Sequence, residues 1–325
     1  MKLNFRLTCC AALLLCASNF GEAFADEGYY FPSNLSQDHT PQKLPNAIRA
    51  SVRIVNGHGN CSAALISSDG YVLTAGHCIK ECMIKNGFAE WTQNSNPYYE
   101  IFRVTAQSPM KNPCTLAISE LGVQDPDIIL VGKGFTAFDD AHVSQYSPEQ
   151  IDEFVRNQDD FAILKYSLLK NVPCVSPRWT EVLKGEAVWA VGYPGKNIRA
   201  EGLGSNGQSE YISFGKITQG SSESAWVKSR NMSAAEIARL DAYYDKPSQF
   251  RSDMDTYPGS SGSMTIDQEG KLVGVNVAIA VSTAGIIYGQ YFSGISVSYR
   301  LTSIRDQIAQ TFGEKKVDEI FSCKN

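Results

Sequence analysis

Three residue types that together can carry out nucleophilic catalysis stand in separate motifs of this chain. His77 lies in Thr74-Ala-Gly-His-Cys78, Asp160 opens Asp160-Phe-Ala-Ile-Leu164, and Ser261 lies in Gly259-Ser-Ser-Gly-Ser263. A serine hydroxyl is a weak nucleophile at neutral pH, so it needs a general base and donors for the oxyanion. The set predicts acyl transfer, with Ser261 as nucleophile, His77 as general base and Asp160 as the acid that orients it.

The order of these residues along the chain excludes one rival arrangement. An α/β-hydrolase carries its serine first and its histidine last, but no histidine follows Ser261. The subtilisin order is disfavoured because His77 follows a strand-like run, Gly70-Tyr-Val-Leu-Thr74, and not a helical one. Asp159 is an alternative acid, and Asp160 is preferred because it directly precedes an alternating strand.

The motifs resemble those of trypsin-like serine proteases. Cys61–Cys78 is similar to the first-barrel signature of that family, and Asp160–Leu164 is similar to its acid-bearing strand. In the second half, Gly192–Gly195, Gly215–Thr218 and Gly259–Ser263 more closely resemble the bacterial glutamyl endopeptidases. The resemblance covers roughly residues 50–310. It implies an all-β fold of two six-stranded antiparallel β-barrels of the chymotrypsin type, with a C-terminal helix.

The resemblance also implies roles for residues around the nucleophile. The backbone N–H groups of Gly259 and Ser261 would form the oxyanion hole. Asp255, Thr256 and Asn276 would border the first substrate subsite. Asp255 stands where trypsin has its pocket aspartate, which favours basic side chains, but Asp-Thr also occurs in glutamyl endopeptidases. Asn276 replaces the histidine with which those enzymes hold a glutamate, so acidic and basic preferences both stay open.

Six cysteines follow the N-terminal segment, and six allow fifteen pairings. The family pattern pairs Cys61 with Cys78, which would fix the histidine loop. The other four would then pair as Cys82–Cys114 and Cys174–Cys323. A zinc site is the alternative, but no Cys-x-x-Cys pair occurs and exported chains favour disulfides. We expect no metal and no cofactor.

The N-terminus has the pattern of an export signal. Lys2 and Arg6 precede an apolar run and the small residues Ala23-Phe-Ala25, and the run is too short to span a bilayer. The expected organisation is a signal peptide (1–25), a propeptide or flexible segment (26–49), a first barrel (50–170), a second barrel (171–300) and a C-terminal helix and tail (301–325). The mature chain would be secreted or periplasmic.

Net charge argues against nucleic acid or an anionic membrane as a partner. The net charge is −5, and no basic tract occurs. We expect a monomer that acts on protein or peptide substrates, with no membrane attachment after signal removal. The main hypothesis is a secreted serine endopeptidase. The alternatives are a protease-like binding protein with little or no turnover and an esterase that uses the same triad.

Short apolar segments separated by turns predict the strands of both barrels. The expected strands are 51–55, 61–67, 70–74, 99–104, 128–131 and 161–166 in the first barrel, and 187–191, 211–214, 216–218, 263–266, 272–280, 285–291 and 295–298 in the second. A capping box predicts a helix over 233–243, and a closing helix is expected over about 299–312.

One segment, Arg53-Ile-Val-Asn-Gly57, imitates the new amino terminus of an activated trypsin zymogen. That mechanism needs an aspartate just before the nucleophile, and Ser260 stands there instead. We therefore expect Ile54 and Val55 to lie in a strand. Any activation would remove a segment before about Ala50.

Overall fold

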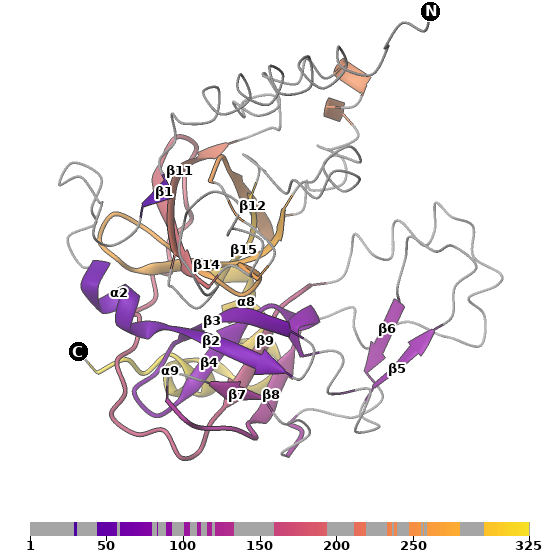
Figure 1. Ribbon diagram of the computed structural model, residues 1–325, viewed down its shortest axis with the longest axis vertical. Helices are drawn as coiled ribbons and strands as arrows, with labels where there is room; N and C mark the ends of the chain where they lie inside the picture. The colour runs from indigo at the N-terminus through magenta and orange to yellow at the C-terminus, as the bar shows by residue number, and fades with distance from the viewer. Residues whose placement is uncertain are drawn as a thin grey trace, which may run out of the picture.

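The structure is a computed structural model (Figure 1). It describes residues 29–30, 44–56, 59–79, 83, 89–92, 101–104, 109–111, 116–118, 121–132, 159–193, 211–218, 233–235, 237–238, 247–254, 256, 259–279 and 296–324. Within these residues, two large antiparallel sheets and a two-stranded ladder, β5 (Ala89–Thr92) with β6 (Ile101–Val104), account for the strands. The all-β fold expected from the sequence is confirmed.

The first sheet, called the first barrel below, is open within the described residues, and two of the predicted catalytic residues lie next to the ends of its strands. Its strand order is β7-β2-β3-β4-β9-β8. The strands are β2 (Ser51–Asn56), β3 (Gly59–Leu65), β4 (Tyr71–Thr74), β7 (Ala117–Ile118), β8 (Asp127–Val131) and β9 (Ala162–Lys165). In β2, Val52 and Ile54 are buried and Arg53 and Val55 less so, the period-two pattern of a strand. The expectation that Ile54 and Val55 lie in a strand is met.

The second sheet, called the second barrel below, closes on itself. Its strand order is β1-β11-β10-β13-β14-β15-β12, and the additional pairing of β11 with β12 completes a ring of β10 to β15. The strands are β1 (Tyr29–Tyr30), β10 (Ala187–Gly192), β11 (Tyr211–Thr218), β12 (Gln249–Ser252), β13 (Met264–Ile266), β14 (Leu272–Ile279) and β15 (Ser296–Arg300). The two segments expected at 211–214 and 216–218 form one continuous strand, β11.

Two helices, and not one, follow the second barrel. They are α8 (Leu301–Phe312) and α9 (Glu314–Ile320), separated by Gly313. Figure 1 shows α8 near the junction of the two sheets and α9 beside the first barrel. The tail beyond α9 is joined to the segment between the barrels by a disulfide, Cys174–Cys323. The segment expected to be a tail is therefore folded against the protein.

A continuous apolar core connects the parts. It contains side chains from the first barrel, from one side of the second barrel and from both C-terminal helices. Within the segment 26–49, expected to be a propeptide or flexible, the structure places β1 on β11 and begins α2 (Leu44–Ala50), whose Ala47 and Ala50 are buried. The signal peptide, the 285–291 strand, much of the 233–243 helix and the Cys82–Cys114 pair lie outside the described residues.

The described residues contain no helix that is long and apolar enough to cross a membrane.

Candidate active site

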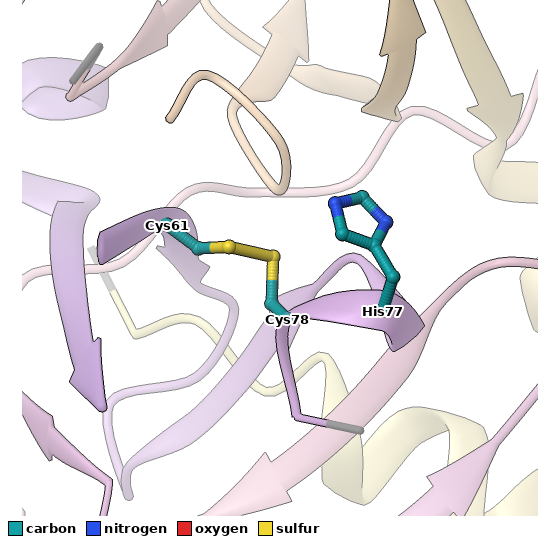
Figure 2. A group of neighbouring side chains, drawn as sticks. All are labelled: Cys61, His77 and Cys78. Atoms are coloured by element: carbon teal, nitrogen blue, oxygen red, sulfur yellow. A yellow bond between two sulfur atoms is a disulfide. The ribbon is translucent and has the colours of Figure 1, made fainter. Parts of the chain in front are cut away.

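His77 lies directly after a fully buried strand and is held by a short turn and a disulfide. Every residue of β4 is buried, and the chain then forms the 3₁₀ turn η2 (Gly76–Cys78). Cys78 is joined to Cys61 of β3, and Figure 2 shows the His77 ring beside this bond. This is the pairing that the family pattern implies. The His77 side chain keeps 35% of its surface exposed, so the imidazole is accessible from solvent.

Both carboxylate oxygens of Asp160 accept hydrogen bonds from His77. The backbone N–H of His77 donates to Oδ1 (2.8 Å), and Nδ1 lies 2.7 Å from Oδ2. The contact follows from strand pairing: β9 runs antiparallel to β4 with Ala162 opposite Thr74, so the start of β9 lies beside the end of β4. Because a carboxylate only accepts hydrogen bonds, Nδ1 carries the proton, and in the neutral imidazole Nε2 is the acceptor.

Asp159, the alternative acid, points to other partners. Ser248 Oγ donates to Asp159 Oδ1 (3.2 Å), and the side-chain amide of Gln307 on α8 donates to Asp159 Oδ2. Asp159 therefore links the first barrel to α8, whereas the carboxylate of Asp160 contacts the histidine.

The loop that carries Ser261 lies beside the Cys61–Cys78 disulfide. The backbone N–H of Ser62 on β3 donates to the carbonyl of Ser261 (2.8 Å), and Cys78 Sγ lies 3.7 Å from that carbonyl oxygen. The loop thus sits beside Cys78, the residue that follows His77 in the chain. Strand β3, the turn η2 and the Ser261 loop meet at this point.

Two glycines allow the loop to adopt this shape. Gly262 has φ +86°, and a Cβ built on it would lie 1.9 Å from the carbonyl oxygen of Ser62. Gly259 has φ +96°, in the region that side chains with a Cβ rarely adopt. Close packing on β3 therefore requires glycine at position 262, whereas the positive φ favours glycine at position 259.

Comparison with known proteins places this arrangement in a family. The family model for the trypsin-like peptidase domain matches residues 61–275, more than half of the chain. The chain belongs to the trypsin-like peptidase family. This result confirms the resemblance seen in the motifs and supports a hydrolase of the serine protease class. A search of curated proteins finds no match.

The chain is also similar to several solved structures. A mutant of Rv3671c from M. tuberculosis H37Rv in its inactive form is 14% identical, with a TM-score of 0.45, and the match covers 87% of this chain and 96% of that one. A Glu endopeptidase in complex with MPD is 16% identical, with a TM-score of 0.43 and coverages of 88% and 97%. A serine endoprotease from Yersinia pestis is 16% identical, with a TM-score of 0.42 and coverages of 87% and 67%. The glutamyl endopeptidase branch stays a prediction.

The residues predicted for the first subsite of this trypsin-like peptidase have different surroundings. Thr256 is buried, and among the described residues its hydroxyl has no hydrogen-bond partner. Asn276 on β14 is also buried, but its amide is engaged at both ends: Nδ2 donates to the carbonyl of Ser260 (3.3 Å), and Oδ1 accepts from Ser296 Oγ (2.7 Å). Asp255 lies outside the described residues.

In the described part of this peptidase, the potential metal ligands that come together are Cys61, His77 and Cys78, with ligand atoms within 4.8 Å of one another. The two sulfurs form the disulfide, so neither is a thiolate that could bind zinc. The grouping is a consequence of the histidine loop and its disulfide.

Sequence reasoning missed the contacts that this peptidase uses to hold its site in place. Ser62 contacts the Ser261 loop, and Ser248 and Gln307 hold Asp159. The hydroxyl of the buried Tyr299 on β15 forms a hydrogen bond with the backbone of Asp160. Burial raises the pKa of this tyrosine. All of these contacts join residues far apart in the chain, and no local motif marks them.

Proposed function

We propose that this chain is a serine endopeptidase that hydrolyses peptide bonds through an acyl-enzyme. The observation that carries the proposal is the double hydrogen bond between Asp160 and His77, which fixes the imidazole with Nε2 as acceptor. The position of the Ser261 loop beside Cys78 adds support.

In the proposed mechanism, Nε2 of His77 takes the proton of Ser261 as the serine oxygen attacks the scissile carbonyl carbon. The backbone N–H groups of Gly259 and Ser261 stabilise the oxyanion of the tetrahedral intermediate. The intermediate collapses when the imidazolium gives its proton to the leaving amine, and Asp160 stabilises that imidazolium. Water then attacks the acyl-enzyme by the same route, releases the acid product and restores the serine.

Labelling and hydrolysis together test the proposal. Wild-type protein should react with a fluorophosphonate probe and cleave a peptide library, whereas Ser261→Ala and His77→Ala should lose several orders of magnitude in turnover. The double variant should lose little more than either single one, because the residues act as a unit. Ser303→Ala on α8 is the control for a serine outside the loop. Full activity of Ser261→Ala would refute the assignment.

The same experiment separates the alternative function. A wild-type protein that binds peptides but neither reacts with the probe nor turns over would be a protease-like binding protein. The triad residue types are all present in this chain, and this favours turnover.

For the first subsite, which Asp255, Thr256 and Asn276 would border, we propose that Thr256 and Asn276 form a neutral polar pocket without a strict preference for basic side chains. Support comes from the hydroxyl of Thr256, which is buried and has no hydrogen-bond partner within the described residues, since an unpaired buried polar group costs free energy that a hydrogen bond to a polar ligand would recover. Cleavage of matched Arg, Glu and Leu substrates by wild type and Asp255→Asn tests this. A strong Arg preference that collapses in the variant would overturn it.

We further propose that residues 1–25 direct export and that the protein works outside the cytoplasm as a monomer. The disulfides Cys61–Cys78 and Cys174–Cys323 support an oxidising compartment. Amino-terminal sequencing of exported protein tests the first point, and a start at Met1 would contradict it.

A further inference from the structure

The side chain of Ser62 bonds to the loop that carries the proposed nucleophile. Ser62 on β3 is fully buried. Its hydroxyl donates to the carbonyl of Gly259 (2.9 Å) and accepts from the backbone N–H of Tyr193, directly after β10 (2.7 Å). The direction of both bonds is fixed, because an amide N–H only donates and a carbonyl only accepts. The single hydroxyl proton of Ser62 therefore goes to Gly259.

The backbone of Ser62 holds the same loop. Its N–H donates to the carbonyl of Ser261 (2.8 Å), and its own carbonyl accepts from Thr74 Oγ1 (2.8 Å). Gly262 packs so closely on that carbonyl that no Cβ fits between them. Ser62 is thus fixed by β4 on one side and by the loop on the other, so its hydroxyl has little freedom to turn away.

Fixing the loop carbonyls also orients the loop N–H groups. A trans peptide is planar, so the C=O of one residue and the N–H of the next point in opposite directions. The carbonyl of Ser260 accepts from Asn276 Nδ2 (3.3 Å) and from the N–H of Ser263 (2.8 Å), which turns the N–H of Ser261 the opposite way. Ser62 fixes the preceding plane in the same manner through the carbonyl of Gly259.

Those two planes lie between the two proposed oxyanion donors, the N–H groups of Gly259 and Ser261. The first plane begins at the Cα of Gly259, and the second contains the N–H of Ser261. Gly259 has a positive φ and no Cβ, so its own conformational preference holds the loop only weakly. We propose that Ser62 is a positioning residue of the oxyanion hole: its hydroxyl fixes the peptide plane after Gly259 and thereby keeps both donors aimed at the substrate carbonyl. This inference rests on the proposed peptidase function.

Ser62→Ala tests the proposal against Ser67→Ala. Ser67 is also fully buried, and its Oγ also binds two backbone groups: it accepts from the N–H of Asp69 (3.2 Å) in the turn before β4 and from the N–H of Tyr71 (3.0 Å), the first residue of β4. Hydrolysis of a peptide p-nitroanilide is measured with active sites counted by burst titration. We expect Ser62→Ala to lower kcat by about 10- to 100-fold with KM within about threefold, because the lost contact acts on the transition state. Ser67→Ala should keep kcat within about twofold.

A second measurement keeps the test valid if Ser62→Ala folds poorly. Ser62→Thr retains the hydroxyl. In either variant, the affinity for a peptide boronic acid, which uses the oxyanion hole, is compared with the affinity for the matching peptide that lacks the boronic acid group. Loss of boronic acid affinity in parallel with kcat, and its partial retention in Ser62→Thr, would support the role.

Wild-type kcat in Ser62→Ala, or an equal loss in Ser67→Ala, would overturn the inference. Wild-type protein without turnover or probe labelling would instead refute the proposed peptidase function, so the two failures are distinguishable.

Discussion

Replacing Asp160 with asparagine changes the location of one proton in the site. The backbone N–H of His77 donates to Asp160 Oδ1, and Nδ1–H donates to Oδ2. Asparagine offers one accepting and one donating end. The backbone N–H cannot accept, so it selects the amide oxygen and leaves the amide nitrogen facing Nδ1. The ring must then accept at Nδ1 and carry its proton on Nε2, where it cannot take the proton of Ser261.

The wrong tautomer removes the general base while the number of hydrogen bonds stays the same. General-base catalysis contributes about 10²- to 10⁴-fold, and the same exchange in a His-Asp-Ser triad lowers kcat by about 10⁴. We therefore expect kcat/KM to fall by about 10⁴, which corresponds to about 5.5 kcal/mol of transition-state stabilisation. The melting temperature should change little, because both hydrogen bonds between residue 160 and His77 are kept.

Asp159→Asn is the matched control, one residue away in the chain. Its carboxylate contacts Ser248 and Gln307, so this change weakens the attachment to α8 and leaves the imidazole tautomer intact. Hydrolysis of a chromogenic peptide, corrected for folded fraction by circular dichroism, should give kcat/KM within about tenfold of wild type. The reasoning fails if Asp160→Asn keeps more than about a tenth of wild-type activity, or if folded Asp159→Asn loses as much.

Two further outcomes concern maturation and stability. Mass spectrometry of active protein should show a chain that begins upstream of about Ala50, because Ile54 is buried within β2 and pairs with Cys61. Active protein that begins uniformly at Ile54 would contradict this. Glu319→Gln should lower the melting temperature at neutral pH, where the hydrogen bond from Lys316 holds the pKa of Glu319 below its ordinary value of 4.5. A carboxylate whose pKa is lower in the folded protein stabilises the folded state above the unfolded pKa, and this stabilisation is lost as the pH falls. The difference in melting temperature between the variant and wild type should therefore shrink below about pH 4.5. A pH-independent difference would count against this role.

The strands around the predicted catalytic residues could be placed from the sequence because their signals are local. Apolar alternation in Ser51–Val55 and the short apolar segments beside the catalytic motifs gave β2, β4 and β9 nearly at their bounds. Preference for Asp160 over Asp159 also came from a local feature, the start of a strand. The structure agrees with it because antiparallel pairing brings that start to the end of β4.

The elements that were missed depend on tertiary contacts. Strand β12 reads Gln-Phe-Arg-Ser, and all four residues are buried although three are polar. Helix α9 is seven residues long, too short to be stable alone. It is held by Tyr71, whose hydroxyl donates to Glu319, and by the disulfide of Cys323. Ser62 gave no signal either, because its partner Gly259 lies 197 residues away.

The contacts of Ser62 and Asn276 also bear on why Ser260 can replace the aspartate of activated trypsins. An aspartate at that position would be buried, since Ser260 is 3% exposed, and a buried ion pair loses much of its Coulomb energy to desolvation. Here the carbonyls of Gly259, Ser260 and Ser261 accept neutral hydrogen bonds instead. Neutral donors need no newly formed ammonium group. We therefore expect residues 259–263 to hold this conformation without cleavage at Ile54.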